Sequence, residues 1–347
     1  MPQFSFDLAS RSDQRECREA IRRGSKSFYA ASRLLPAEVR QRAFALYAFC
    51  RLSDDAVDLS DGAPDAILRL TDRLDRAARG RPRPFAADRA LADAMRRSAI
   101  PLAIPEALLE GLAWDAEGRS YETLDDLYDY AARVAGTVGV MMTLIMGVRS
   151  AEALARACDL GVAMQLTNIA RDVGEDARLG RVYLPRQWLR EAGVDANDFL
   201  ADPRPDPLIR GLVARLLDQA RTLYRQGQGG VALLPANCRP AIVAAGLIYA
   251  EIGARVERNG FDSVTVRARV SGRRKLELLA QAVALSARLP AGPPLPAPAC
   301  GQFLIDAVEN GRPAPRRPSR PFVEWRESAI GALHLFERLG RAERLGA

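Results

Sequence analysis

Hydrophobic residues recur at intervals of three and four positions along most of this chain, whereas the strict alternation of β-strands is scarce. The spacing predicts helices over 12–24, 37–59, 65–79, 87–97, 105–117, 123–147, 150–175, 206–231, 239–258 and 272–289. Prolines at Pro36, Pro101, Pro105 and Pro185, and a Pro-rich run over 202–207, separate several of these helices. The pattern therefore predicts an all-α protein with one helical domain over residues 1–290.

The pattern changes after residue 290. The stretches PAGPPLPAPA and GRPAPRRPSRP are rich in proline and partly basic, which predicts a linker over 291–321. Helical spacing resumes over 322–347 and predicts a C-terminal amphipathic helix, whose apolar face would comprise Phe322, Trp325, Ala329, Leu333 and Phe336. Packing on the body of the protein and binding to a membrane surface are both compatible with such a face.

Two stripes of polar residues interrupt the apolar helices. The first comprises Tyr47, Arg51, Asp54 and Asp58, with offsets of 0, 4, 7 and 11. The second comprises Gln165, Asn168, Asp172 and Asp176, with offsets of 0, 3, 7 and 11. Residues three and four apart share one face of a helix, so each set forms a single stripe.

The surroundings of both stripes are apolar, as in ALYAFCRL and LGVAMQLTNIA. Buried carboxylates are costly unless a metal ion or a fixed cation offsets the lost hydration. A solvated acidic face, or ion pairs with Arg51 and Arg171, would explain either stripe alone. Two carboxylate stripes together favour a Mg²⁺ cluster, and Mg²⁺ held by carboxylates is typical of sites that bind phosphate groups.

The composition argues against several classes of function. Hydrophobic residues make up 48% of the 347 residues, enough for a sizeable core. The formal net charge is +7, but Arg is interspersed with Asp and Glu, which argues against nucleic-acid binding. The only histidine, His334, argues against histidine-based zinc chemistry and a Ser-His-Asp triad. Five scattered cysteines are typical of reduced thiols in a cytoplasmic protein.

Two further details concern ligand binding. Lys26 and Lys275 are the only lysines among 50 basic residues, which is compatible with a need for a compact ammonium group there. Gly136 and Gly139 lie in the longest apolar stretch, 134–148, which is too short and glycine-rich to span a bilayer. These glycines would permit either a ligand chain beside the helix or close packing of a second helix.

Four motifs carry a family resemblance. They are GSKSFY from Gly24, LYAFCRLSDDAVD, YETLDDLYDYAARVAGTVG, and QLTNIARDVGEDARLGRVYLP. In this order and spacing they resemble the squalene/phytoene synthases, and the resemblance extends over about residues 12–290. The second acidic motif with its GRVYLP continuation is the most specific of them. Within the family, the similarity is greatest to the phytoene-forming bacterial members.

The resemblance implies an all-α isoprenoid-synthase bundle around one central cavity. It implies a prenyltransferase that condenses two geranylgeranyl diphosphates head to head, through a cyclopropylcarbinyl diphosphate, to phytoene. Mg²⁺, or Mn²⁺ in its place, would be the cofactor, and NADPH would not be required. The alternatives are squalene, dehydrosqualene or hydroxysqualene formation from farnesyl diphosphate, and a non-catalytic helical scaffold. The retention of all five metal-ligand candidates argues against the scaffold.

The resemblance also assigns roles to residues. Asp54, Asp58, Asn168, Asp172 and Asp176 would hold Mg²⁺, and the four aspartates would be catalytic. The positions expected to contact substrate are Ser25, Lys26, Ser27, Tyr47, Arg51, Gln165, Arg171, Tyr249, Arg269 and Lys275. Gly24 departs from the family pattern, because relatives often have His there, so one phosphate contact is in doubt.

An apolar product implies work at a membrane surface. The net positive charge and the Arg-rich C-terminal segment are compatible with binding to anionic lipids. We therefore expect a cytoplasmic protein at the periphery of the inner membrane. A carotenoid desaturase that takes up the product is the partner we expect downstream.

Overall fold

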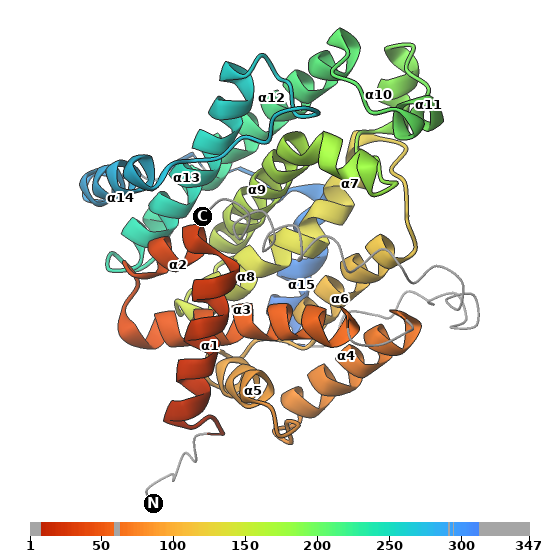
Figure 1. The fold of residues 1–347 in the computed structure, drawn as a ribbon. Helices are drawn as coiled ribbons and strands as arrows, with labels where there is room; N and C mark the ends of the chain where they lie inside the picture. The colour runs from red at the N-terminus through yellow and green to blue at the C-terminus, as the bar shows by residue number, and fades with distance from the viewer. Residues whose placement is uncertain (1–7, 59–62, 291, 294, 312–347) are drawn as a thin grey trace, which may run out of the picture.

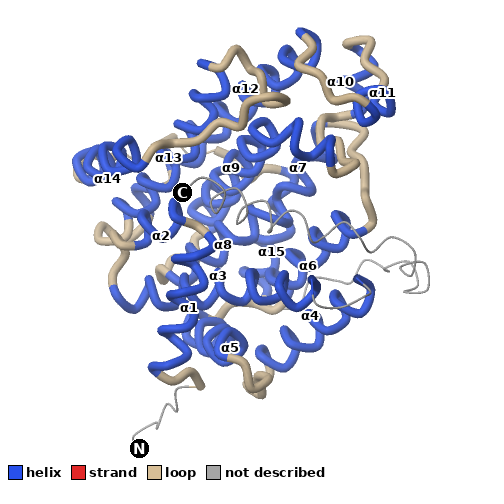
Figure 2. Tube along the Cα trace, in the orientation of Figure 1, coloured by secondary structure: helices blue, strands red, loops and turns tan. Residues whose placement is uncertain are grey.

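The computed structural model describes residues 8–58, 63–290, 292–293 and 295–311, with the backbone alone over 52–58 and 63–66. Within these residues the regular structure consists entirely of helices joined by turns and loops, as Figure 2 shows. The all-α prediction is therefore confirmed. None of the described helices is both long and apolar enough to cross a membrane.

The helices follow one another in the order of Figure 1. They are α1 (Arg11–Gly24), α2 (Lys26–Ser32), α3 (Ala37–Asp58), α4 (Ala63–Ala78), α5 (Ala86–Ser98), α6 (Ala103–Ala116), α7 (Leu124–Ala131), the π-helical η1 (Ala132–Gly136), α8 (Thr137–Ile145), α9 (Ala151–Arg178), α10 (Arg186–Glu191), α11 (Ala196–Ala201), α12 (Pro207–Gly229), the 3₁₀ turn η2 (Val231–Leu233), α13 (Arg239–Arg258), α14 (Gly272–Ser286), the 3₁₀ turn η3 (Ala299–Gly301) and α15 (Gln302–Asn310). All ten predicted helices are present. Short α2, α10, α11 and α15 were not predicted.

Helix α9 occupies the centre of the bundle (Figure 1). It is 28 residues long, and α8, α12, α13 and α15 pack around it. Leu154, Ala163, Leu166 and Ala170 are fully buried along its length. A helix that is covered on nearly all sides carries any polar residue on it into the interior, so α9 determines where the second polar stripe lies.

The glycines of the 134–148 stretch serve close helix packing. A Cβ atom on Gly136 would lie 2.8 Å from the Cys158 sulfur on α9. A Cβ on Gly139 would overlap the carbonyl of Ala157, and one on Gly161 of α9 would overlap the carbonyl of Ala135. The structure therefore favours close helix packing over a ligand chain beside these glycines.

The predicted linker over 291–321 differs from what the structure shows. Helix α15 lies within this range and packs on α6 and α9, with Leu304 and Ile305 buried. The chain leading to it is also attached, because Arg156 Nη2 donates to the carbonyl of Pro296 at 2.7 Å. The proline content obscured a short apolar helix, so packing continues past the predicted boundary at 290. The predicted C-terminal helix over 322–347 lies outside the described residues.

Candidate functional site

The second polar stripe forms a buried row of oxygen and nitrogen atoms on α9. Gln165, Asn168, Asp172 and Asp176 are between 2% and 8% exposed. Asn168 Nδ2 donates to Gln165 Oε1 at 3.4 Å. Asn168 Oδ1 and Gln165 Nε2 have no hydrogen-bond partner among the described residues. Buried polar atoms of this kind are normally satisfied, so their state indicates a place for a ligand.

Two arginines hold the carboxylate of Asp172. Arg171 donates from Nε to Oδ1 at 2.8 Å and from Nη2 to Oδ2 at 2.6 Å. Arg267 donates from Nε to Oδ1 at 2.8 Å and also pairs with Glu175 at 3.0 Å. Burial disfavours the charge of Arg171, but the Asp172 carboxylate outweighs this effect and raises the pKa of the guanidinium above its ordinary value. Two fixed positive charges therefore stand beside the stripe, as binding of an anion requires.

Arg267 reaches the stripe because its loop is fixed on α9. The backbone N–H of Gly174 donates to the carbonyl of Ser263 at 3.0 Å, and Arg178 donates to the carbonyl of Val264 at 2.6 Å. A Cβ on Gly174 would lie 2.5 Å from Val264 Cα, so only glycine permits this approach. The RDVGED motif thus requires a glycine at position 174 so that the 263–264 backbone can approach α9.

The arginine that contacts Asp172 is Arg267, which the sequence did not single out, and the substrate contact expected of its neighbour Arg269 stays a prediction. Arg269 is exposed, whereas the side chain of Arg267 is 19% exposed and contacts Asp172. The pair of arginines two residues apart was visible, but nothing in the sequence indicated which one faces α9. That choice follows from the loop lying on Gly174, a tertiary contact. Lys275, the other predicted residue of this region, is half-buried at the start of α14.

We expect Gly174→Ala to destabilise the protein by about 1–3 kcal/mol, because the added methyl would press against backbone that cannot move aside. The Michaelis constant for a diphosphate substrate should rise too, since the loop carries Arg267. Thermal unfolding and steady-state kinetics measure the two effects. Gly211→Ala is the matched control: its Cβ meets nothing within 4 Å in helix α12, so stability should rise by about 0.5–1 kcal/mol. Unchanged unfolding of Gly174→Ala would contradict the packing argument.

The serine-lysine-serine run lies at the start of α2. Ser25 caps this helix by accepting from the N–H of Phe28 at 3.2 Å. Ser25 and Ser27 are buried, whereas Lys26 is exposed. The ring of Phe28 stacks on buried Tyr249 of α13, with 5.2 Å between centroids. Because α13 also packs on α9, the run, Tyr249 and the second stripe belong to one region of the fold.

Tyr47 packs directly against Gly24. A Cβ atom on Gly24 would overlap the hydroxyl of Tyr47, so the tyrosine fills the space in which a side chain at position 24 would begin. With Tyr47 in this position, a histidine at position 24, which is frequent in the family, would not fit. Arg51, one turn further along α3, is 7% exposed.

The first acidic motif is placed through its backbone alone. Asp54 and Asp58 belong to the last turns of α3, as predicted, but their side chains lie outside the described part of the structure. Helix α8 packs against both α3 and α9. That the two motifs face each other stays a prediction.

The GRVYLP segment begins with a turn that brings the chain back to the C-terminal end of α9, where the second motif ends. Gly180 has a φ of +76°, a conformation that favours glycine, and the N–H of Arg181 donates to the carbonyl of Asp176 at 2.9 Å. Tyr183 then lines a small cavity together with Asp176. The specificity of this motif thus reflects a turn that closes the end of α9.

A tyrosine cluster that sequence analysis did not single out lies at the same place. Tyr183 and Tyr130 both donate to the carboxylate of buried Asp115, at 2.6 and 2.7 Å. Burial, with Asp115 beside them, raises the pKa of both phenols well above the ordinary value. Both hydroxyls therefore stay protonated and fix the chain that follows α9.

The donor set of the second motif fits Mg²⁺ or Mn²⁺, because Asn168, Asp172 and Asp176 offer oxygen atoms only. Within the described side chains, no three carboxylate, histidine or cysteine groups are arranged so that they could hold a metal ion. The motif therefore needs further ligands, and a phosphate group and the carboxylates of α3 are the expected ones.

The fold and this site define an isoprenoid-synthase type of helical protein. The family model for squalene/phytoene synthase matches residues 21–275. This match covers more than half of the chain, and the chain belongs to the squalene/phytoene synthase family.

Known proteins are similar over most of the chain. It is 49% identical to a phytoene synthase of Cereibacter sphaeroides, with 98% of each chain covered. It is 51% identical to a phytoene synthase of Rhodobacter capsulatus, over 89% of this chain and 94% of the relative. Among solved structures, a dehydrosqualene synthase in complex with a ligand matches with a TM-score of 0.73 and 32% identity, over 79% of this chain and 96% of that one.

Proposed function

We propose that this protein is a phytoene synthase that condenses two geranylgeranyl diphosphates head to head, as the first step of carotenoid biosynthesis. The family assignment and the nearly full-length similarity to phytoene synthases support the reaction class. The single structural observation that carries the proposal is the buried stripe on α9. It combines oxygen donors with two arginines, Arg171 and Arg267, at one carboxylate.

The residues of the stripe have complementary parts in this reaction. Asn168, Asp172 and Asp176 would hold Mg²⁺, and bound Mg²⁺ would act as a Lewis acid that neutralises the charge of the diphosphate. Arg171 and Arg267 would donate to phosphate oxygens and stabilise the negative charge that develops on the leaving group. Because the Asp172 carboxylate keeps Arg171 charged despite its burial, this positive charge is already in place when the bond breaks.

The bond changes balance without a reductant. The C1–O bond of the first substrate breaks and releases pyrophosphate, and the resulting allylic cation alkylates the 2,3 double bond of the second substrate. Loss of a proton closes the cyclopropane ring and gives a cyclopropylcarbinyl diphosphate. That intermediate loses its own pyrophosphate, rearranges, and releases a second proton to give phytoene. NADPH would be needed only if hydride, rather than proton loss, ended the sequence.

The apolar surroundings of the site suit a carbocation. The ring of Tyr249 stacks on that of Phe28, and Tyr249 lies close enough to Arg171 to influence its charge. Aromatic faces attract cations. Helices α8 and α9 contribute fully buried apolar side chains to the core of the bundle, including Val140, Met141 and Leu166. A site enclosed by such a core would keep water from a reactive cation.

Product identification tests the proposal. The purified protein is incubated with geranylgeranyl or farnesyl diphosphate, with Mg²⁺, and with or without NADPH. We expect phytoene from geranylgeranyl diphosphate, independent of NADPH and abolished by a metal chelator. A C30 hydrocarbon formed preferentially from farnesyl diphosphate would show that farnesyl rather than geranylgeranyl diphosphate is the substrate. Absence of any hydrocarbon from either substrate would overturn the enzymatic assignment.

We further propose that the protein acts on the cytoplasmic side of the inner membrane, at its surface, and passes phytoene to a carotenoid desaturase. The apolar nature of the product supports this, because phytoene has no polar group to keep it in water. The net charge of +7 supports it too, since anionic lipids attract basic proteins.

A further inference from the structure

Exposed hydrophobic side chains gather around helix α14. Nine large hydrophobic residues are exposed among those the structure describes, and five of them lie between 266 and 295. These five are Val266, Leu276, Val283, Leu285 and Leu295. Leu276 is the most exposed, at 69%. Three of the five lie on α14 itself and two in the loops on either side of it. Scattered exposed hydrophobics are ordinary, but their concentration in one segment is not.

The exposed side of α14 carries a continuous apolar strip, with Arg273, Glu277 and Gln281 as the exposed polar residues of the helix. Its inner side, with Leu278, Ala282 and Ser286, is buried against the body. Helical spacing places five exposed residues on the opposite side: Leu276, Ala280, Val283, Ala284 and Ala287. None of these five is polar. We call this set the outer face of α14.

Basic residues border the outer face. Residues 266–295 contain six basic side chains and a single acidic one, and two of the basic ones, Arg267 and Arg274, are paired with Asp172 and Glu251 outside this range. The acidic side chain, Glu277, is already paired with Arg273 and Arg274. The side chain of Arg273 is 91% exposed at the start of the outer face, and Arg288 is exposed just beyond its end. The surface is therefore apolar along its centre and positive at both ends.

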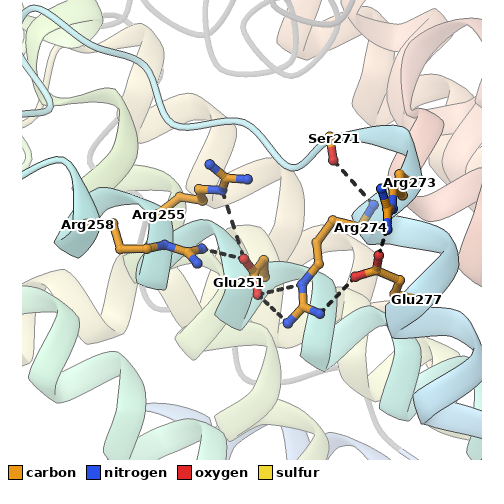
Figure 3. Close-up of polar contacts among 7 residues, drawn as sticks. All are labelled: Glu251, Arg255, Arg258, Ser271, Arg273, Arg274 and Glu277. Carbon is orange, nitrogen blue, oxygen red and sulfur yellow. Dashed lines mark hydrogen bonds and ion pairs between the residues drawn. The ribbon is translucent and has the colours of Figure 1, made fainter.

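Helix α14 is held rigidly despite its position at the edge of the molecule (Figure 1). The carboxylate of buried Glu251 on α13 forms ion pairs with Arg274, at 3.0 Å, and with Arg258, as Figure 3 shows. The loop that precedes α14 carries Arg267 to Asp172. One short segment of the chain, from Arg267 to the start of α14, therefore connects the proposed diphosphate site with the outer face.

We propose that the outer face of α14 is the surface by which this protein lies on an anionic lipid bilayer. The leucine and valine side chains would enter the region between headgroups and acyl chains, and the arginines at each end would contact anionic headgroups. This inference rests on the proposed function, because long prenyl tails and an apolar product have to pass between bilayer and site. The bordering positive charge favours anionic lipid over a second copy of this basic chain as the occupant.

Vesicle flotation tests the proposal on the full chain, with vesicles of phosphatidylglycerol and phosphatidylcholine in equal amounts. Leu276→Glu with Val283→Glu should reduce partitioning by about tenfold or more, because two side chains that would enter the bilayer become charged. Arg273→Gln and Arg288→Gln should each reduce it about fivefold, and only on vesicles that contain phosphatidylglycerol.

Matched controls separate the surface from general effects. Leu68 and Leu208 are 45% and 48% exposed on α4 and α12, so Leu68→Glu with Leu208→Glu adds the same charge elsewhere and should leave partitioning unchanged. Activity on substrate dispersed in detergent should be the same in all variants, which tests the proposed function separately. Equal partitioning of the outer-face variant and the wild type would overturn the inference. So would a change in its oligomeric state without lipid, which would identify a second copy as the occupant.

Discussion

Asp172→Asn is expected to lower kcat/KM for the diphosphate substrate by about a thousandfold. The change removes one negative charge from the centre of the stripe, where Asp172 is 2% exposed and is contacted by Arg171 and Arg267. The amide keeps the size of the side chain but is a poor ligand for Mg²⁺. Steady-state kinetics over a range of Mg²⁺ concentrations measure the loss, and added Mg²⁺ should not restore activity.

The same change should cost stability, because it leaves Arg171 buried without its carboxylate. Removal of one partner of a buried ion pair typically costs about 3–5 kcal/mol. Asp159 provides the control: it lies on the same helix, is 1% exposed, and pairs with buried Arg156 at 3.0 Å. It is 13 residues from Asp172, about 20 Å along the helix. Asp159→Asn should disturb stability while kcat/KM stays near the wild-type value, and equal losses of activity in both variants would show that unfolding alone explains them.

The sequence was sufficient to predict the helices and the second stripe because both depend on local periodicity. All ten helices predicted between residues 12 and 289 are present, and Gln165, Asn168, Asp172 and Asp176 share one buried face of α9 as their spacing required. Long amphipathic helices have enough turns for the pattern to be unambiguous. Short helices do not, and α15 was read as part of a linker for this reason and because prolines precede it.

Contacts between distant segments could not be predicted in the same way. The choice of Arg267 over Arg269 depends on a loop that lies against Gly174, ninety residues earlier in the chain. The relation between Gly24 and Tyr47 is likewise a matter of two helices meeting at one point. In both cases a glycine stands at the point of contact, but a glycine in a sequence does not reveal which atoms approach it.

Asp54→Glu and Asp172→Glu are each expected to lower kcat/KM by about thirtyfold to a hundredfold, and the double variant only a few-fold further. The reason is that carboxylates of α3 and α9 would hold the same diphosphate through shared Mg²⁺ and would act as a unit, so damage to one side would remove most of what the other contributes. Glutamate is the suitable replacement because it keeps the charge and shifts it by one methylene, which leaves activity measurable in the double variant.

This double-mutant cycle tests directly whether the two motif helices face each other. Asp54 lies in the final turns of α3, Asp172 lies on α9, and α8 packs against both helices. Asp54→Glu combined with Asp159→Asn serves as the reference pair, in which the separate effects should multiply because Asp159 is distant from the stripe. If the losses in the Asp54 and Asp172 pair also multiply fully, the two carboxylates act independently and a shared metal-diphosphate cluster is excluded. If they do not, the coupling measures an interaction that neither motif shows alone.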